Sequence, residues 1–183
     1  MNSTILKTDR LELIGCTPEL LRAEGEDRAR FGALLQARVP EAWPPELYDD
    51  DARLYTLRMA EAAPQDEGWW FYYILLPDDG GGGRELIGLV GYKGPPADDG
   101  TVEVGYGVVP EHRRRGYASE AVGALLERAF GFPRVTRAIA ETYPELVPSI
   151  GVLEKHGFAF AGDGSEERVI RFELPRERWE ARR

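Results

Sequence analysis

The spacing of hydrophobic residues changes near residue 110 and divides the most informative stretch of the chain into two elements. From Thr101 to Val109 most residues are β-branched, aromatic or glycine, which favours a β-strand that ends before Pro110. Alternation along this strand puts three valines and Tyr106 on one face and Glu103, among small residues, on the other. Small and aliphatic residues then recur at the spacing of one helix face: Ala118, Ala121, Val122, Leu125, Leu126 and Ala129. The pattern therefore predicts a strand, a turn and a helix in immediate succession.

The same reasoning along the whole chain predicts a mixed α/β fold. We expect further strands over residues 11–14, 69–76, 86–92, 136–142, 158–161 and 169–174. We expect helices over residues 18–37 with a break, 51–62 and 149–156, the first of them capped by Thr17. Prolines make residues 39–46 irregular, and glycines mark turns at 78–83 and 94–100. This order indicates a central mixed β-sheet with helices on both faces, an α/β (α+β) architecture.

The turn between the strand and the central helix carries the clearest chemical signal. Arginines, a glycine and small residues directly before a helix can hold a phosphate or pyrophosphate through backbone N–H groups and the helix dipole. The candidate contacts are Arg113, Arg114, Arg115, Gly116, Tyr117, Ala118 and Ser119. A P-loop is excluded because no Lys-Ser or Lys-Thr follows a glycine run. A dinucleotide fingerprint is excluded because Gly105 and Gly107 precede the turn.

Composition narrows the class of protein without identifying a substrate. The chain has 183 residues and a net charge of −9, which argues against a nucleic-acid partner and suits a cationic substrate. Cys16 is the only cysteine, so neither an intramolecular disulfide nor a thiolate metal cluster is expected. The sequence contains no membrane-spanning run and no signal-peptide pattern, so we expect a soluble cytoplasmic protein with a single domain, residues 1–183.

The strand, turn and helix together resemble the acetyl-CoA motif of the GNAT superfamily of N-acetyltransferases, Arg/Gln-x-x-Gly-x-Gly/Ala. Arg113, Gly116 and Ala118 occupy its fixed positions. The order of the expected elements is also similar to the GNAT fold over nearly the whole chain. The resemblance implies that acetyl-CoA is the cofactor and that its pyrophosphate lies at residues 113–119.

A second segment, residues 144–158, resembles the Rim-type branch of the superfamily, which comprises the ribosomal-protein N-terminal acetyltransferases and their relatives. The family form is Asn-x-x-Ser-x-x-x-Leu-Glu-Lys-x-Gly-Phe, and the matching residues are Ser149, Leu153, Glu154, Lys155, Gly157 and Phe158. Residues 8–13 resemble the same branch. Leu146 stands where the family has an asparagine that bonds the pantetheine arm, so that contact is lost or replaced. Leu153 stands where many other GNATs have a tyrosine as general acid, which leaves the acid unassigned.

The resemblance also implies roles for four residues, with alternatives. Glu103 is the expected general base, and the alternative is a surface glutamate paired with a neighbouring lysine or arginine. Ser149 is expected either to bond pantetheine or the thiolate sulfur, or to cap the helix that follows it. A backbone N–H at a bulge near Val108 or Val109, where the strand leaves its neighbour, is expected to bind the oxyanion, and both residues are expected to contact the cofactor.

Four further residues have simpler interpretations. For His112, a solvated loop position is favoured over a catalytic one. His156, at a helix end, suits the helix dipole as an imidazolium and is expected to be structural. Cys16 is expected to be buried and unreactive. Trp43, flanked by prolines, either walls the acceptor pocket or packs to pin a surface loop.

Together these features predict an acetyl-CoA-dependent N-acetyltransferase that acts by direct transfer in a ternary complex. The expected partner is an amine acceptor, either a protein N-terminus or a small-molecule amine, with no nucleic acid and no membrane involved. The oligomeric state stays open, and a homodimer is one of the alternatives. Two other functions also stay open: a non-catalytic module that binds coenzyme A or acetyl-CoA, and an interaction protein that retains the fold.

Overall fold

A mixed eight-stranded sheet forms the centre of the structure, a computed structural model that describes residues 4–78, 80 and 82–182. The strands lie in the order β1-β2-β3-β4-β5-β6-β8-β7, with β5 and β6 parallel and the other neighbouring pairs antiparallel. Their bounds are β1 Ile5–Lys7, β2 Glu12–Gly15, β3 Phe71–Pro77, β4 Arg84–Tyr92, β5 Thr101–Val108, β6 Arg137–Thr142, β7 Ala159–Asp163 and β8 Ile170–Pro175. The helices are α1 Pro18–Glu26, α2 Arg28–Leu35, α3 Asp50–Ala62, α4 Tyr117–Phe130, α5 Val147–Lys155 and α6 Arg176–Glu180.

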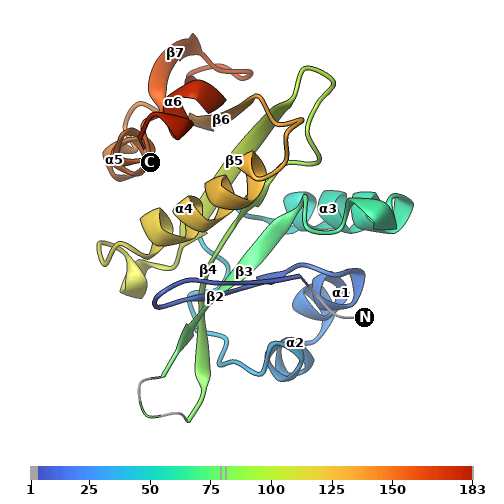
Figure 1. Cartoon of the computed structure of the whole chain (residues 1–183). Coiled ribbons are helices and arrows are strands. Elements are labelled where there is room, and N and C mark those ends of the chain that lie inside the picture. Colours follow the sequence, from blue (N-terminus) through green and yellow to red (C-terminus); the bar gives the residue numbers. More distant parts are fainter. Residues whose placement is uncertain (1–3, 79, 81, 183) are drawn as a thin grey trace.

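Helices cover both faces of this sheet, as predicted, and each face has its own hydrophobic core. The α4-side core contains buried residues of α4 and α5, and the α1-side core contains those of α1 and α2. Figure 1 shows these helix groups on either side of the sheet. Successive residues of β3 enter different cores: Tyr72 and Ile74 the α4-side core, and Phe71, Tyr73 and Leu75 the α1-side core. The two cores therefore share the strands that separate them.

The predicted apolar stripe is the surface by which α4 packs on the sheet. Five of its six residues are fully buried: Ala121, Val122, Leu125, Leu126 and Ala129, each 0% exposed. Complete burial of one valine or leucine stabilises the fold by about 1.5–3 kcal/mol. Val102 and Val104 of β5 belong to the same core, which confirms the predicted valine face. This packing fixes the N-terminus of α4 beside the end of β5.

The boundaries of the helices follow local capping. Thr17 caps α1 as predicted, since its hydroxyl accepts a hydrogen bond from the Leu20 N–H at 3.2 Å. The predicted break falls at Asp27, whose carboxylate caps α2. Helix α5 begins at Val147, two residues earlier than predicted, because Pro148 fits the first turn of a helix.

Some elements and residues lie beyond the sequence prediction. Strand β1 and helix α6 were not predicted, because three and five residues are too few to display a period. Asp79 and Gly81, in the predicted turn at 78–83, lie outside the described residues.

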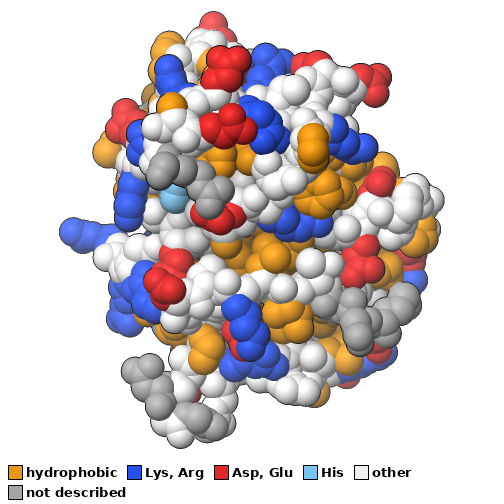
Figure 2. All heavy atoms as spheres, in the orientation of Figure 1, with side chains coloured by type: hydrophobic (Ala, Val, Ile, Leu, Met, Phe, Trp, Pro, Cys, Tyr) orange, Lys and Arg blue, Asp and Glu red, His pale blue; other side chains and the backbone are white. Residues whose placement is uncertain are grey.

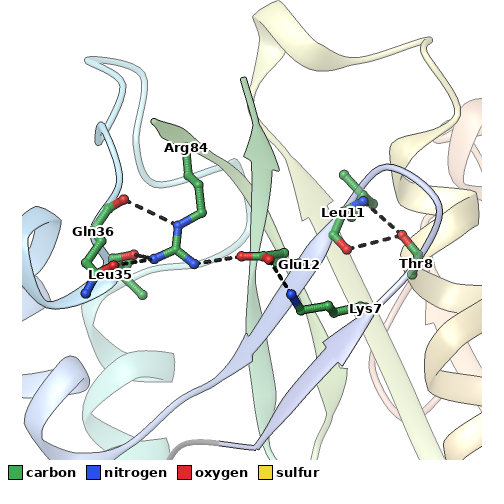
Figure 3. A network of polar contacts seen from close by, with 7 residues as sticks. All are labelled: Lys7, Thr8, Leu11, Glu12, Leu35, Gln36 and Arg84. Carbon is green, nitrogen blue, oxygen red and sulfur yellow. Dashed lines mark hydrogen bonds and ion pairs between the residues drawn. The ribbon is translucent and has the colours of Figure 1, made fainter. Parts of the chain in front are cut away.

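Arg84 of β4 contacts both β2 and the end of α2, and so ties α2 to the sheet (Figure 3). Its guanidinium donates to the Glu12 carboxylate at 2.7 Å and to the Leu35 carbonyl at 2.8 Å. Hydrogen bonds from Arg84 and Lys7 hold the pKa of Glu12 below its ordinary value. These contacts anchor the turn between β1 and β2, in which the Thr8 hydroxyl accepts from the Leu11 N–H at 3.0 Å.

Candidate active site

Strand β5 leaves its parallel neighbour β6 partway along its length. The two strands pair only where Thr101–Glu103 faces Arg137–Ile139. Strand β5 continues to Val108 and pairs with β4 over Val104–Val108. Within the described part of the chain, no strand pairs with the other edge of Val104–Val108. This confirms that the strand leaves its neighbour, as the sequence analysis expected.

The sheet hydrogen bonds show which main-chain groups of β5 face that unpaired edge. The Lys93 N–H donates to the Glu103 carbonyl at 3.0 Å, and the Val109 N–H donates to the Ile87 carbonyl at 2.9 Å. Odd-numbered residues therefore point their main-chain groups toward β4, and even-numbered residues, Val108 among them, toward the unpaired edge. Of the two expected backbone donors, only Val108 stays a candidate, because the Val109 N–H is already bonded within the sheet.

The described strands include a bulge on β4, and the bulge expected at the end of β5 is not found. In the pairing of β3 with β4, Ile74 faces Gly88 and Leu75 faces Leu86, so Ile87 is the extra residue. The pairing of β5 with β4 runs without a register shift, and the expectation of a bulge at Val108 or Val109 is wrong. Main-chain groups of β5 are exposed by its departure from β6.

The arginine turn ends at Gly116, which begins α4 in a left-handed conformation. Its φ is +83°, and no side chain caps the helix. The Cβ of a larger residue would meet its nearest neighbour at 3.4 Å, so glycine is required here by backbone conformation more than by space. The N–H groups of Tyr117, Ala118 and Ser119 have no partner within the helix itself. An uncapped helix start of this kind can bind an anion through these groups and the dipole.

The three arginines of the turn differ in what they contact. Arg113 donates from Nε to the Val108 carbonyl at 2.9 Å, and its guanidinium lies 3.2 Å from the Glu46 carboxylate. Arg114 and Arg115 are exposed, and their side chains make no ion pair with any described residue. Two guanidinium groups are therefore available to an anion at the turn, and the third holds the end of β5.

Arg10 is a further cation at the turn, and sequence reasoning did not single it out. Its guanidinium donates to the Arg115 carbonyl at 3.1 Å and to Glu120 of α4 at 2.7 Å, and it lies 4.6 Å from the centre of the Tyr117 ring. The signal was present, because residues 8–13 carry a family resemblance. The contact itself joins residues more than a hundred positions apart, which local patterns cannot show.

The Ser119 side chain points away from the turn and into the contact between α4 and α5. Its hydroxyl lies 3.1 Å from His156 Nε2, and the same nitrogen donates to the Ser119 carbonyl at 2.7 Å. Only the backbone N–H of Ser119 therefore stays a candidate for phosphate binding. Burial lowers the pKa of His156, although the bond to Ser119 opposes this. The expected imidazolium is wrong, and His156 is a neutral link between two helices.

Glu103 lies on the face of β5 opposite the valines, beside an uncrowded position. Its carboxylate is ion-paired with Lys93, the pairing that the sequence analysis gave as the alternative to a general base. The side chain of Glu103 is 24% exposed, so it stays accessible. At Gly105 no atom lies within 4 Å of where a Cβ would stand, whereas Pro45 packs on Gly107 at 3.3 Å. This face therefore offers space for a substrate next to a carboxylate.

Ser149 lies in the first turn of α5, where it faces Tyr106 of β5. Of the two interpretations of Ser149, the one that makes it an N-cap is wrong, because Leu146 occupies that position. The Tyr106 hydroxyl lies 2.9 Å from the Ser149 carbonyl oxygen and 3.0 Å from the Ser149 hydroxyl. Leu153 is buried in the α4-side core at 1% exposed and carries no polar group. Ser149 and Tyr106 thus bring two hydroxyl groups together where α5 contacts β5.

Trp43 packs as a core residue, so the second of its two interpretations holds. It is 8% exposed, and its indole N–H donates to Glu24 at 2.9 Å. Glu24, which the sequence analysis did not single out, also accepts hydrogen bonds from Tyr73 and Tyr48. Burial raises the pKa of Glu24, although these bonds favour its charged form. This network holds the proline-rich loop against the α1-side core.

The remaining sequence candidates are structural. His112 is not solvated, since its side chain is 12% exposed and lies 3.4 Å from Glu85. Cys16 is buried as expected, and burial raises the pKa of its thiol to about 12.

Acidic and basic side chains are interspersed over the face drawn in Figure 2. Among the described residues, no helix is both long and apolar enough to span a bilayer.

Comparison with known proteins gives the same family. A family profile described as an acetyltransferase (GNAT) domain matches residues 19–159. The chain is 35% identical over 74 residues to the uncharacterized N-acetyltransferase YjdG of Bacillus subtilis strain 168. The matched segment covers 40% of this chain and 44% of YjdG. It is 40% identical over 62 residues to YnaD of the same organism, a segment that covers 34% of this chain and 36% of YnaD. The chain spans less than half the length of the curated relatives it matches.

Solved structures share the fold over nearly the whole chain. A putative ribosomal-protein-serine acetyltransferase from Vibrio cholerae has a TM-score of 0.64 and 17% identity, with 96% of this chain and 99% of that one covered. The ribosomal L7/L12 alpha-N-protein acetyltransferase RimL in complex with coenzyme A has a TM-score of 0.66 and 16% identity, with 94% and 98% covered. The spermidine/spermine N-acetyltransferase SpeG from Vibrio cholerae has a TM-score of 0.63 and 16% identity, with 96% and 99% covered.

Proposed function

Because the chain belongs to the GNAT acetyltransferase family, we propose that it transfers an acetyl group from acetyl-CoA to a primary amine in one ternary complex. The observation that carries this proposal is the unpaired edge of β5 beside the uncapped start of α4. Acetyl-CoA supplies an activated acetyl thioester. Free main-chain groups of the even-numbered residues along this edge of β5 would bind the pantetheine arm, and residues 113–119 would bind the pyrophosphate.

The acceptor would approach the face of β5 that lies opposite the valines. Glu103 and the open position at Gly105 are on this face. Two acceptor classes are consistent with the family, a protein N-terminus and a small-molecule amine. RimL is named as a protein N-terminal acetyltransferase, and SpeG is named as an acetyltransferase of spermidine and spermine. The net charge of −9 favours a cationic acceptor of either class.

Glu103 is the residue we propose as general base. The attacking amine must be neutral, whereas an α-amino group has a pKa of about 8 and a lysine of about 10.4. The Glu103 side chain is a carboxylate held in an ion pair with Lys93, and a carboxylate can accept a proton. The Val108 N–H would stabilise the oxyanion that forms when the amine attacks.

Acetyl-CoA binding at the turn is tested by Gly116→Val. The substitution places a side chain where the phosphate is expected and strains a residue at φ +83°. Loss of one or two charge-assisted hydrogen bonds should weaken acetyl-CoA binding by about 10- to 100-fold, measured by calorimetry. Gly162→Val is the matched control, since Gly162 has φ +108° and open space around it on β7, away from the turn. Equal acetyl-CoA affinity in wild type and a folded Gly116→Val variant would place the cofactor elsewhere.

The role of Glu103 is tested by Glu103→Gln, which keeps the shape of the side chain. If Glu103 removes the amine proton, turnover should fall by about 10²- to 10⁴-fold at neutral pH with acetyl-CoA affinity unchanged. The loss should shrink at high pH, where more of the amine is already neutral. Lys93→Gln is the control, because it breaks the ion pair and keeps the carboxylate.

The same assays separate the alternatives. Spermidine and a short peptide with a free N-terminal serine serve as acceptors, with coenzyme A release as the readout. Tight acetyl-CoA binding without turnover on any amine would indicate a cofactor-binding module. Absence of coenzyme A binding would indicate an interaction protein that retains the fold.

A further inference from the structure

The contact between Tyr106 and Ser149 bridges β5 and α5 at the place where β5 leaves β6. The phenol oxygen lies 2.9 Å from the Ser149 carbonyl oxygen and 3.0 Å from Ser149 Oγ. Both residues are half-buried. The main-chain groups of Tyr106 face the unpaired edge of β5, which is the edge proposed to bind the cofactor.

The phenol has one proton and two acceptors at nearly equal distance, so two hydrogen-bond patterns are available. In the first pattern, Tyr106 donates to the Ser149 carbonyl and the Ser149 hydroxyl donates to Tyr106. In the second, Tyr106 donates to Ser149 Oγ, and the Ser149 proton is free to point elsewhere. Exchange between the patterns needs only rotation of two hydroxyl groups.

We propose that Tyr106 is a positioning residue that acts through Ser149, so that the Ser149 hydroxyl donates a hydrogen bond to the sulfur that leaves the thioester. This inference rests on the proposed function. The first pattern satisfies both hydroxyls in the empty site, and the second operates when the sulfur becomes an acceptor. A donated bond from Tyr106 also polarises the Ser149 hydroxyl and makes it a stronger donor.

The Ser149–Tyr106 pair acts by hydrogen bonding, and neither hydroxyl gives up its proton. Burial raises the pKa of Tyr106 to about 12, although the bond with Ser149 opposes this, whereas a thiol has a pKa of about 8.5. In the reaction, the C–N bond forms, the C–S bond breaks and the sulfur keeps the electron pair. The amine proton goes to Glu103 and then to solvent, and the thiolate takes its proton from solvent, so the protons balance.

The Ser149–Tyr106 pair would also supply the donor that is missing at Leu153, where many other GNATs have a tyrosine. The Leu153 side chain is buried in the α4-side core and cannot donate to sulfur. The Ser149–Tyr106 pair supplies a donor from the neighbouring turn of the same helix and from β5.

A double-mutant cycle with Tyr106→Phe and Ser149→Ala tests the inference. The variants are compared for kcat on the best acceptor of the amine panel, for acetyl-CoA affinity and for thermal stability. Tyr106→Phe should lower kcat by about 3- to 10-fold, the effect of one net hydrogen bond, with acetyl-CoA affinity unchanged. In the Ser149→Ala background, Tyr106→Phe should have no further effect on kcat. Ser149→Thr, which keeps the hydroxyl, should retain most of the activity.

Tyr92→Phe is the matched control for a purely structural effect. Tyr92 is buried, and like Tyr106 it donates to a backbone carbonyl, that of Leu125 in α4, but no hydrogen bond joins it to Ser149. Its loss should lower the melting temperature and leave kcat unchanged. The high-pH limb of the kcat profile should be the same in Tyr106→Phe and wild type, because Tyr106 does not transfer its proton.

Four outcomes would overturn the inference while leaving the proposed function in place. They are an unchanged kcat in Tyr106→Phe, a kcat loss that adds to that of Ser149→Ala, a fall in acetyl-CoA affinity that accounts for the whole effect, and a shifted high-pH limb. Absence of wild-type turnover with every amine would overturn the proposed function and this inference together.

Discussion

Glu120 is the carboxylate that joins Thr8 and Arg10 to the first turn of α4, next to the arginine turn. It accepts hydrogen bonds from the Thr8 hydroxyl at 2.6 Å, from the Arg10 N–H at 2.8 Å and from Arg10 Nε at 2.7 Å. Partial burial alone would raise the pKa of Glu120, but these hydrogen bonds together lower it below the ordinary value. The folded state therefore prefers the charged form more strongly than the unfolded state does.

Glu120→Gln should destabilise the protein in a pH-dependent manner. At pH 7 the loss should be about 1–3 kcal/mol, since hydrogen bonds to a charged group are replaced by weaker ones. Because the folded pKa of Glu120 is lowered, this stabilisation is present above the unfolded value of 4.5 and is lost as the pH falls through the folded value. Urea unfolding at pH 7 and pH 3 measures the difference. Glu145→Gln, in an exposed ion pair with Arg168, is the control, and an equal loss for Glu120→Gln at both pH values would contradict the argument.

At the scale of residues, sequence reasoning succeeded where chemistry is local and failed where it is not. It placed Gly116 at the start of α4, because a glycine before a periodic helix is a local signal. It did not single out Arg10 or Glu24, whose roles depend on partners far along the chain. It placed Tyr106 on the valine face of its strand from alternation alone. The alternation was right, but the position of the hydroxyl depends on where α5 packs.

At the scale of elements, α4 and α5 are joined by a neutral histidine. His156 at the end of α5 bonds Ser119 in the first turn of α4, and its ring lies 3.2 Å from where a Cβ on Gly123 would stand. Helix α5 carries Ser149, so this contact helps to place the hydroxyl proposed to act on the leaving sulfur.

The stability of this helix pair should fall in mild acid. Burial lowers the pKa of His156 below 6.5, so the unfolded chain binds a proton more readily than the folded one. The stabilisation is therefore present above pH 6.5 and lost as the pH falls through the folded value. Unfolding free energies between pH 7.5 and 5.5 should fall more steeply for wild type than for His156→Gln, which keeps a donor for the Ser119 carbonyl. Parallel curves for the two proteins would show that His156 does not titrate in this range.

The elements that sequence predicted and those that it missed differ in where their information lies. Helix α4 shows its core-facing stripe in the order of its own residues, and that stripe is buried. Strand β1 and helix α6 are stabilised by contacts outside their own few residues, such as the pairing of β1 with β2 and the stacking of Trp179 on Phe130. The start of α5 was misplaced because Ser149 resembles a cap, whereas Pro148 extends the helix toward Val147.

At the scale of the whole molecule, the shared sheet couples the two cores. Tyr72 of β3 is buried in the α4-side core, and the adjacent Tyr73 is buried in the α1-side core. Strand β3 cannot leave one core without disrupting the other, since successive residues of one strand serve both. The same strand also pairs with β2 and β4 on its two edges, so its loss would remove the centre of the sheet.

Residues 1–183 should therefore unfold in one cooperative transition, the behaviour of a single domain. Trp43 and Trp70 report on the α1-side core, and Trp69 reports on the α4-side core. Urea curves followed by tryptophan fluorescence and by far-ultraviolet circular dichroism should coincide, and each Trp→Phe variant at these three positions should keep a single midpoint for both probes. Leu125→Ala, which removes a fully buried side chain from the α4-side core, should lower the free energy of unfolding by about 2–5 kcal/mol. The urea midpoint should fall with it, and the curve should not split. A second transition confined to the α1-side tryptophans would show instead that the two faces of the sheet fold as separate units.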